Sequence, residues 1–390
     1  MPPSPGGVAQ WGYWMARRLR ERGLDVVYAA RGDFARGQEF YGDAFTVLPI
    51  RVRDWRHRKD LPIFRALTTA WKRHRPRAII CLNCKVARIP LLMRPLTGWK
   101  VAVIAHGMEV TKNGDRLRRR LGLRWVFGAA DLAVAVSRYT RSRVLGFGVD
   151  PDHVRVLPCG VDPERFRRRD GALARERFGL GDRPILLTLS RLVSRKGHDL
   201  VIRALPEILR TVPRALYVIA GPPNPPYEER LRSLARDLGV SDALLFLGYV
   251  ASDEMADLYS AADVYVMTSR TQSGDDNFEG FGITYLEANA CGVPVVGADS
   301  GGVADAIADG ETGYLVPPDD VPALAARLGT LLANPDAARR MGAAGRARVE
   351  RQFGWDRIAA RFLLALEEKT GPLAGAGADL RSYPEPEIAR

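Results

Sequence analysis

Residues 279–288 read Glu279-Gly280-Phe281-Gly282-Ile283-Thr284-Tyr285-Leu286-Glu287-Ala288. From Ile283 onward the apolar residues recur at helical spacing, and Gly292 supplies a stop signal. The run just upstream, 264–267, is apolar and of strand length. The stretch therefore predicts a strand, a glycine-containing loop and a helix whose N-terminus opens at residues 280–282.

Such a helix N-terminus is suited to bind a phosphate, because its N–H groups are free and the helix dipole is positive there. Glu279 and Glu287 flank it. Carboxylates repel phosphate, but they accept paired hydrogen bonds from vicinal hydroxyls. One phosphate site between two diol-binding carboxylates indicates a nucleotide sugar. The alternative is an acidic loop followed by an ordinary solvated helix glutamate.

The Glu-x7-Glu spacing within EGFGITYLEA resembles the donor signature of retaining GT-B glycosyltransferases of family 4. The segment His-Gly-Met-Glu-Val at 106–110 and the loop leading to residue 279 are most similar to the phosphatidylinositol mannosyltransferase branch. The resemblance covers nearly the whole chain and is strongest over 185–316. It implies an α/β fold of the GT-B type, with two Rossmann-like doubly wound domains facing each other across a cleft.

The same resemblance implies a reaction. A retaining, metal-independent enzyme of this type moves a hexosyl unit from a GDP- or UDP-sugar to an acceptor hydroxyl. A lipid-linked acceptor or a cell-envelope glycan precursor is expected, with no cofactor.

Strand-like runs alternate with helical stretches throughout, which is typical of parallel, doubly wound sheets. We expect strands at 24–30, 45–50, 78–82, 101–105, 132–136, 154–157, 185–189, 216–220, 244–248, 264–267, 293–297 and 313–316. Helices are expected between them, for instance at 198–211 and 227–238.

A break rich in Pro and Gly at 158–162 predicts the hinge between two domains. The expected domains are 1–158, on the acceptor side, and 159–354, which binds the nucleotide sugar. The resemblance implies that a helix at 355–369 crosses back to the first domain. Residues 370–390 are rich in Gly, Ala, Pro and charge, and we expect a flexible tail.

Gly6 and Gly7 precede the first helical pattern, where a backbone without side chains can approach the donor phosphates. Enzymes of this type begin with a buried strand before such a loop, and no strand precedes it here. We therefore expect the true start codon to lie upstream, so that a longer chain would be better folded.

A cationic loop follows the strand at 185–189. Ligands of doubly wound sheets bind at the carboxyl ends of strands, so Arg191 and Lys196 are expected to face the site. Both match the family's diphosphate-binding positions, and two cations stabilise a departing diphosphate without a metal. Arg195 is expected to be a surface residue. The alternative is a solvated basic loop.

Polar residues follow two of the expected strands in the first half of the chain. His106 follows the strand at 101–105, where the resemblance implies contact with the transferred sugar or the acceptor, supported by Glu109. Ser137 and Arg138 follow the strand at 132–136 and resemble a site near the acceptor or phosphate.

Further donor contacts are implied by the resemblance. Tyr249 and Val250 follow the strand at 244–248, where the family holds the nucleobase largely by backbone groups. The glycine loop itself, from Gly280 through Phe281 and Gly282 to Ile283, is expected to contact the donor. Cys81 and Cys84 form one CxxC pair with neither a second pair nor a histidine at zinc spacing, so no metal site is expected.

Composition limits the class of protein. A chain of 390 residues, 46% hydrophobic, suits two globular domains. The longest apolar runs have only strand length, no secretory signal is visible, and four cysteines make no disulfide scaffold, so a cytoplasmic location is expected.

The balance of charged residues differs between the two halves of the chain. Residues 1–160 carry 30 Lys and Arg against 12 Asp and Glu, whereas residues 161–390 carry 28 against 33. Within the basic half, 116–127 alternates arginines with Leu117, Leu121, Trp125 and Phe127. This segment either lies peripherally on the anionic inner face of the plasma membrane or is an ordinary helix with an apolar core face.

Other functions remain as alternatives. An NDP-sugar epimerase or hydrolase on the same scaffold would consume donor without an acceptor. A nucleic-acid-binding protein could use the basic half, but no recognisable reading module accompanies the charge, and no nucleic-acid partner is expected. An oxidoreductase is disfavoured, since no G-x-G-x-x-G follows the first strand.

Overall fold

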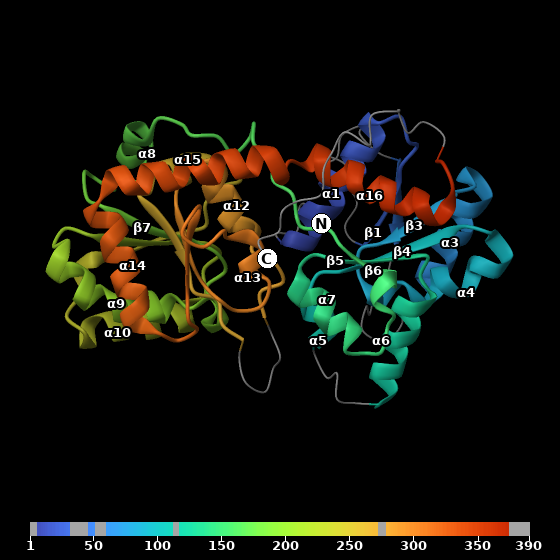
Figure 1. Cartoon of the computed structure of the whole chain (residues 1–390), viewed down its shortest axis with the longest axis horizontal. Coiled ribbons are helices and arrows are strands. Elements are labelled where there is room, and N and C mark those ends of the chain that lie inside the picture. The colour runs from blue at the N-terminus through green and yellow to red at the C-terminus, as the bar shows by residue number, and fades with distance from the viewer. Residues whose placement is uncertain (1–5, 32–45, 51–59, 112–116, 272–277, 374–390) are drawn as a thin grey trace. The chain divides into compact units, whose positions relative to one another are not determined.

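The computed structural model describes residues 6–31, 46–50, 60–111, 117–271 and 278–373, which form two compact units (Figure 1). Unit 1 contains the described residues up to Cys159 together with the segment that begins at Trp355. Unit 2 contains Gly160–Gly354.

Unit 2 is built on one parallel sheet, with strand order β12-β11-β10-β7-β8-β9. The central strands β7, β8, β10 and β11 are buried along their whole length, as expected for a sheet covered on both faces. The strands are β7 (Ile185–Leu189), β8 (Leu216–Ala220), β9 (Leu244–Gly248), β10 (Val264–Met267), β11 (Val295–Ala298) and β12 (Gly313–Val316).

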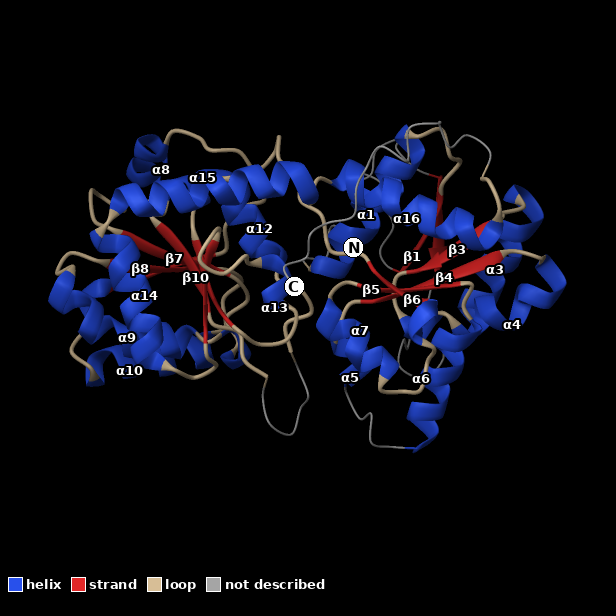
Figure 2. Cartoon of the chain, viewed as in Figure 1, coloured by secondary structure: helices blue, strands red, loops and turns tan. Residues whose placement is uncertain are grey.

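Helices cover both faces of this sheet (Figure 2). Val264 and Val266 of β10 pack in one core with α9 (His198–Thr211) and α14 (Val321–Ala333). Tyr265, between them, points to the other face, where its ring contacts Tyr259 and Tyr285. The remaining helices are α8 (Gly171–Arg177), α10 (Pro225–Asp237), α11 (Met255–Ala261), α12 (Ile283–Ala290), α13 (Val303–Ala306) and α15 (Pro335–Gln352), with 3-10 turns η4 (Ser194–Lys196) and η5 (Ser241–Ala243).

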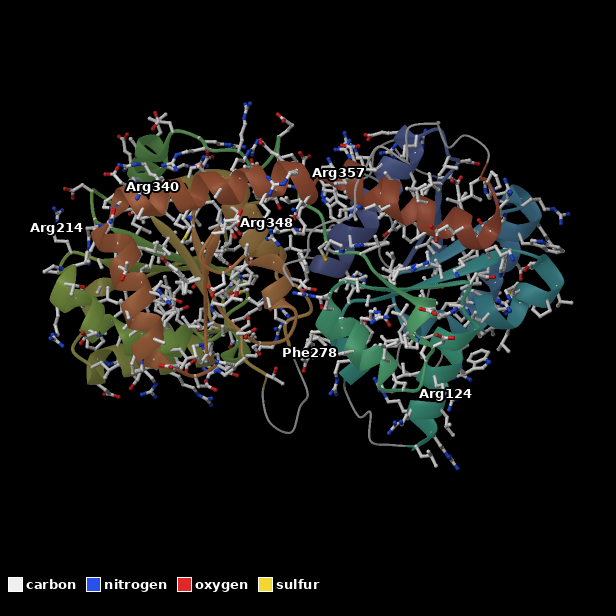
Figure 3. All side chains as sticks on the ribbon, viewed as in Figure 1. Arg124, Arg214, Phe278, Arg340, Arg348 and Arg357 are labelled. Atoms are coloured by element: carbon white, nitrogen blue, oxygen red, sulfur yellow. The ribbon has the colours of Figure 1, made fainter. Side chains whose placement is uncertain are left out.

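One buried arginine fixes the short helix α13 beneath α15 (Figure 3). The guanidinium of Arg348 donates to the carbonyls of Ala306, at 2.7 Å, and Asp305, at 3.2 Å, at the end of α13. Its cation also lies over the ring of Phe353, 4.8 Å from the centroid.

Unit 1 contains two parallel sheets, β1-β2 and β3-β4-β5-β6. Their strands are β1 (Val27–Arg31), β2 (Thr46–Ile50), β3 (Ala78–Cys81), β4 (Lys100–Ala105), β5 (Leu132–Ala135) and β6 (Val154–Val156). Its helices are α1 (Gly7–Glu21), α3 (Asp60–His74), α4 (Arg88–Thr97), α5 (Met108–Thr111), α6 (Leu117–Ala129), α7 (Arg138–Leu145) and α16 (Trp355–Thr370), with 3-10 turns η2 (Cys84–Val86) and η3 (Pro151–His153).

The last helix, α16, packs on the first, α1. The rings of Trp11 and Phe362 meet edge to face at 5.8 Å, and both side chains are fully buried. Arg22, just past α1, donates to the carbonyl of Asp356 at 2.9 Å. The end of the chain therefore completes the core around its beginning.

The predicted fold class, two Rossmann-like doubly wound units with parallel sheets, is confirmed. Several strands occupy the predicted residues, while β1 begins at Val27 rather than at residue 24, and β11 runs Val295–Ala298 rather than 293–297. The strand expected upstream of Gly6 and the cleft between the domains remain predictions. The tail from 374 onward lies outside the described residues. No helix among the described ranges is long and apolar enough to cross a bilayer.

The α1–α16 contact yields a stability prediction. Replacing Phe362→Ala should lower the free energy of unfolding of unit 1 by about 3–5 kcal/mol, because a buried ring leaves a cavity against Trp11. Chemical denaturation followed by tryptophan fluorescence measures the change. Lys369→Ala, at an exposed position of the same helix, is the control and should have little effect. Equal stability of the two variants would contradict the inferred packing.

Candidate functional site

Unit 2 brings two loops together where its strand order reverses. From β7 the chain proceeds outward through β8 and β9, and from β10 it proceeds the other way through β11 and β12, while β7 and β10 are paired neighbours. Ligands of doubly wound sheets bind at the carboxyl ends of strands at such a point. The loop after β7 carries Arg191, Arg195 and Lys196, and the loop after β10 leads to Glu279.

The two loops are bonded to each other. Thr268 Oγ1 donates to the carbonyl of Gly197 at 2.9 Å, and the backbone N–H of Arg270 donates to the carbonyl of Arg195 at 2.9 Å. Gly197 has φ 74°, and a Cβ there would lie 2.2 Å from the Thr268 carbonyl oxygen. Only glycine permits this approach, which holds the cationic turn against the end of β10.

The carboxylate of Glu279 lies at the centre of this junction. Its Oε2 atom accepts from Lys196 Nζ at 2.5 Å, from Arg195 at 3.2 Å and from Ser269 Oγ at 3.3 Å. The side chains of Glu279, Lys196 and Arg195 are only 14%, 10% and 12% exposed. The prediction that Arg195 is a surface residue is therefore wrong, because the 3-10 turn η4 directs its side chain toward Glu279.

The charges in this group perturb one another. Burial opposes ionisation of Glu279, but Lys196 and Arg195 outweigh it and lower the pKa of the carboxyl to about 2. Burial lowers the pKa of Lys196, and Glu279 partly offsets that effect. The pKa of Arg191 is lowered by partial burial and by repulsion from Arg195. Two cations, Lys196 and Arg195, therefore contact the carboxylate, and the charge of Arg191 acts on both Arg195 and Glu279. A bound anion would relieve the repulsion among the three cations.

A glycine pair that the sequence analysis missed fixes the backbone of Glu279. The N–H of Gly302 donates to the Glu279 carbonyl at 2.8 Å. Gly301 has φ 64°, and a Cβ there would lie 2.5 Å from the same oxygen. The available signal was a Gly-Gly pair soon after the strand that ends at Ala298. Ser269, which also holds the carboxylate, carried no signal of its own.

Glu279 leads into the start of α12, as the glycine loop predicted. Phe281 is buried and packs on Phe353 with ring centroids 6.0 Å apart. Gly282 has φ 92°, where a Cβ would lie 2.5 Å from the ring of Tyr285. Gly280 and Gly282 thus flank a buried anchor, and the helix begins at Ile283.

The second glutamate, Glu287, is buried inside α12 and accepts from the hydroxyl of Tyr259 at 2.9 Å. The ring of Tyr265 contacts that of Tyr259. Burial is the main cause that raises the pKa of the Tyr265 phenol well above its usual value, and the charges of Glu287 and Glu279 raise it further.

The predicted nucleobase position lies at the edge strand β9. Tyr249 is 66% exposed, whereas Val250 is buried. The carbonyl of Gly248 accepts from the N–H of Gly221 at 2.7 Å, which joins the carboxyl ends of β8 and β9. Tyr249 and Val250 thus follow the carboxyl end of β9, at the same end of the strands as the cationic loop that follows β7. Strand β8 lies between β7 and β9.

Unit 1 gathers another set of predicted residues, at the carboxyl end of β4. The Glu109 carboxylate accepts from the backbone N–H of His106, and burial raises the pKa of Glu109. The His106 ring meets Trp11 edge to face at 5.9 Å. Burial lowers the pKa of His106 to about 4, so the imidazole is neutral at physiological pH.

The neighbouring strand β5 ends at the other predicted pair. Ser137 is the N-cap of α7: its hydroxyl accepts from the N–H of Thr140 at 3.0 Å. Arg138 is exposed. Gly6 and Gly7 begin α1, where Gly6 has φ 147°, so the helix that carries Trp11 starts at the glycine pair.

No group of three or more His, Cys, Asp or Glu side chains arranged to hold a metal ion occurs in the part of the chain that the structure describes. The thiols of Cys81 and Cys84 are free and buried, and burial raises the pKa of each to about 12.

Comparison with known proteins assigns the family. The family pattern "Glycosyl transferases group 1" matches residues 172–348, and "Glycosyltransferase Family 4" matches residues 5–165. A relative from Mycolicibacterium smegmatis, described as a GDP-mannose-dependent alpha-(1-6)-phosphatidylinositol monomannoside mannosyltransferase, is 44% identical over 67% of this chain and 69% of its own. The chain belongs to the family 4 glycosyltransferases.

Two further relatives of the glycosyltransferase differ in their described activity. A GDP-mannose-dependent monoacylated alpha-(1-6)-phosphatidylinositol monomannoside mannosyltransferase of Corynebacterium glutamicum is 38% identical over 69% of this chain and 70% of its own. A D-inositol 3-phosphate glycosyltransferase of Acidothermus cellulolyticus is 38% identical over 63% of this chain and 54% of its own.

Solved structures support the fold. The Anabaena protein Alr3699/HepE in complex with UDP aligns with a TM-score of 0.79 at 20% identity, over 94% of this chain and 97% of that one. A glycosyltransferase of Rickettsia africae aligns with a TM-score of 0.81 at 20% identity, over 94% and 96%.

The charge network of the glycosyltransferase predicts a pH dependence of stability. The Glu279 carboxyl has a pKa of about 2 when folded, against a usual value of 4.5. Its contribution is fully present above pH 4.5 and is lost as the pH falls toward 2. The Glu279→Gln variant lacks this pH-dependent contribution. Between pH 6 and pH 3, the free energy of unfolding of the wild type should therefore fall by about 2 kcal/mol more than that of the variant.

Urea unfolding at each pH measures this difference. Glu229→Gln is the matched control, because Glu229 pairs with Arg236 at 2.8 Å while remaining 66% exposed. The control should follow the wild type. A Glu279→Gln curve parallel to the wild-type curve would show that the carboxylate is not held as described.

Proposed function

We propose that this glycosyltransferase moves a hexosyl unit, with mannose as the first candidate, from a nucleotide diphosphate sugar to a hydroxyl of a lipid-linked, inositol-bearing acceptor of the cell envelope. The transfer retains anomeric configuration and needs no metal. The observation that carries the proposal is the pairing of Lys196 and Arg195 with Glu279 at the strand reversal of unit 2. The described activities of the mycobacterial and corynebacterial relatives support the choice of GDP-mannose and of the lipid.

Arg191 and Lys196 bind the diphosphate of the donor. As the bond from the anomeric carbon to the phosphate oxygen breaks, negative charge builds on the leaving group, and fixed cations stabilise that charge. Two cations on one loop supply what a metal ion supplies in other enzymes. Gly6 and Gly7, and the N-terminus of α12 from Gly280 to Ile283, add backbone N–H groups.

The glutamates bind hydroxyls. Glu279 holds those of the sugar through its second oxygen, and Glu287 holds those of the ribose, exchanging its bond with Tyr259 for them. Tyr249 and Val250 contact the nucleobase. A contact made mainly by backbone groups discriminates poorly between nucleobases. UDP-sugars therefore remain secondary candidates for the donor.

The acceptor belongs to unit 1, where His106, Glu109, Ser137 and Arg138 gather. The acceptor oxygen forms the new bond to the anomeric carbon on the face from which the diphosphate departs. Its proton goes to the departing phosphate oxygen. His106 is neutral and therefore acts as a hydrogen-bonding group rather than as a charged acid.

We also propose that the enzyme works from the cytoplasm on the inner face of the plasma membrane and uses its basic half there rather than on nucleic acid. Leu117, Leu121 and Trp125 of α6 are 69%, 54% and 41% exposed, and they stand at i, i+4 and i+8, on one face. The exposed arginines of α6 include Arg124 (Figure 3). Phe127 is buried and belongs to the core. Exposed apolar side chains beside cations suit an anionic bilayer surface.

The diphosphate assignment is tested by Lys196→Ala. The variant should lose about 2–4 kcal/mol of transition-state stabilisation, or roughly 30- to 1,000-fold in kcat/KM, because one charge facing the leaving group is removed. Transfer from GDP-mannose to phosphatidylinositol-containing vesicles is measured, with Lys369→Ala as the control. Unchanged kcat/KM in Lys196→Ala would contradict the role. Donor consumed at the same rate without acceptor would favour a hydrolase or epimerase.

The membrane proposal is tested by co-sedimentation with phosphatidylglycerol and phosphatidylcholine vesicles. The triple variant Leu117→Ser, Leu121→Ser, Trp125→Ser should bind the anionic vesicles about tenfold more weakly, because three apolar side chains no longer enter the interface. Leu173→Ser, an exposed leucine of unit 2, is the control. Equal binding by all proteins, or preferential salt-sensitive binding to random duplex DNA, would contradict the proposal.

A further inference from the structure

The loop after β7 carries three cations, Arg191, Arg195 and Lys196, and the proposed mechanism assigns no role to Arg195. Its neighbour Lys196 and the more distant Arg191 bind the diphosphate, whereas Arg195 is directed at Glu279. The Arg195 side chain is 12% exposed, which is unusual for an arginine unless it is paired. Its backbone carbonyl is also tied to the N–H of Arg270, so the residue is fixed at both its backbone and its side chain.

All the hydrogen bonds to the Glu279 carboxylate converge on one oxygen. Arg195, Lys196 and Ser269 donate to Oε2, while Oε1 accepts from no residue in the described ranges. An ionised carboxylate has about four acceptor sites, so Oε1 retains the capacity to bind a ligand. The geometry separates the carboxylate into one oxygen held by the protein and one available to the donor.

The charges at this point match a nucleotide sugar. Arg191, Arg195 and Lys196 carry three positive charges, and Glu279 carries one negative charge. Each phosphate of a diphosphate diester carries a single negative charge. When that group binds, its phosphates compete with Glu279 for the three N–H donors of the Lys196 ammonium, which is a compact charge on a flexible chain. Glu279 would then be left buried with fewer partners, which is unfavourable.

We propose that Arg195 is a positioning residue that keeps Glu279 oriented when Lys196 exchanges the carboxylate for the donor diphosphate. Arg195 and Ser269 together hold Oε2, so Oε1 stays directed at the hydroxyls of the sugar. This inference rests on the proposed donor site. It assigns Arg195 to recognition of the sugar, and separates it from the residues that bind the nucleotide.

The test compares a nucleotide with and without its sugar. Isothermal titration with GDP and with GDP-mannose, and with UDP and UDP-glucose if the first pair does not bind, gives the gain in affinity that the sugar provides. In Arg195→Met this gain should fall by about tenfold or more, because a charged hydrogen bond that orients the sugar-binding carboxylate is lost. Affinity for the nucleotide diphosphate alone should change by less than about threefold, since Arg195 does not bind the phosphates directly.

Three variants separate the roles. Arg195→Lys keeps a charge near Glu279 and should restore part of the sugar-dependent gain. Lys196→Met should weaken GDP and GDP-mannose together, and Arg236→Met, on the surface of α10, should weaken neither. Thermal unfolding of each variant establishes that it is folded. In turnover, Arg195→Met should raise the donor KM and lower kcat, and Arg195→Lys should partly reverse both.

Two results would overturn the proposal. An equal loss of GDP and GDP-mannose affinity in Arg195→Met would make Arg195 a direct diphosphate ligand, and no loss of either would make it a structural residue. A wild-type protein that binds none of the four nucleotides would instead reject the donor site itself, and with it the proposed function.

Discussion

The ion pair between Lys196 and Glu279 is the interaction on which the site depends. It joins the loop after β7 to the loop after β10, two strands that are neighbours in the sheet but distant in the chain. A buried carboxylate is costly without a partner, and a buried ammonium equally so. Each residue therefore makes the burial of the other tolerable, and together they keep charge at the position where we propose that the donor phosphates bind.

Glycines make this arrangement sterically feasible. At positions 197 and 301, a Cβ would collide with a carbonyl of the facing loop. The backbone can then bring cations and carboxylate within hydrogen-bond distance, and the hydroxyl of Ser269 completes the group. The site is thus a product of close backbone packing as much as of its charged side chains.

Much of the fold could be predicted from the sequence because its strands are continuous apolar runs. The residues at 185–189, 216–220 and 264–267 are buried on both faces, so their composition alone identifies them as strands. The motif at 279–288 likewise predicted the start of α12. Apolar periodicity could not say which face of α6 is buried, since both Trp125 and Phe127 are apolar, yet only Phe127 belongs to the core.

Side-chain direction in loops was the main limit for the site. Arg191, Arg195 and Lys196 share one short loop, and nothing in their identities says which cation meets the carboxylate. The 3-10 turn η4 determines this contact, because it directs the Arg195 side chain toward Glu279. Gly301 and Gly302 were missed for a related reason, because their partner, the Glu279 carbonyl, is separated from them by a helix and a strand.

The discontinuity of unit 1 has a consequence for biosynthesis. Unit 2 is one continuous segment, whereas the core of unit 1 needs α16, whose Phe362 packs on Trp11 near the other end of the chain. During translation, unit 2 has all its residues before α16 leaves the ribosome. The half of the molecule that is made first is therefore completed last, and the face of α1 that packs on α16 stays uncovered until α16 has been made.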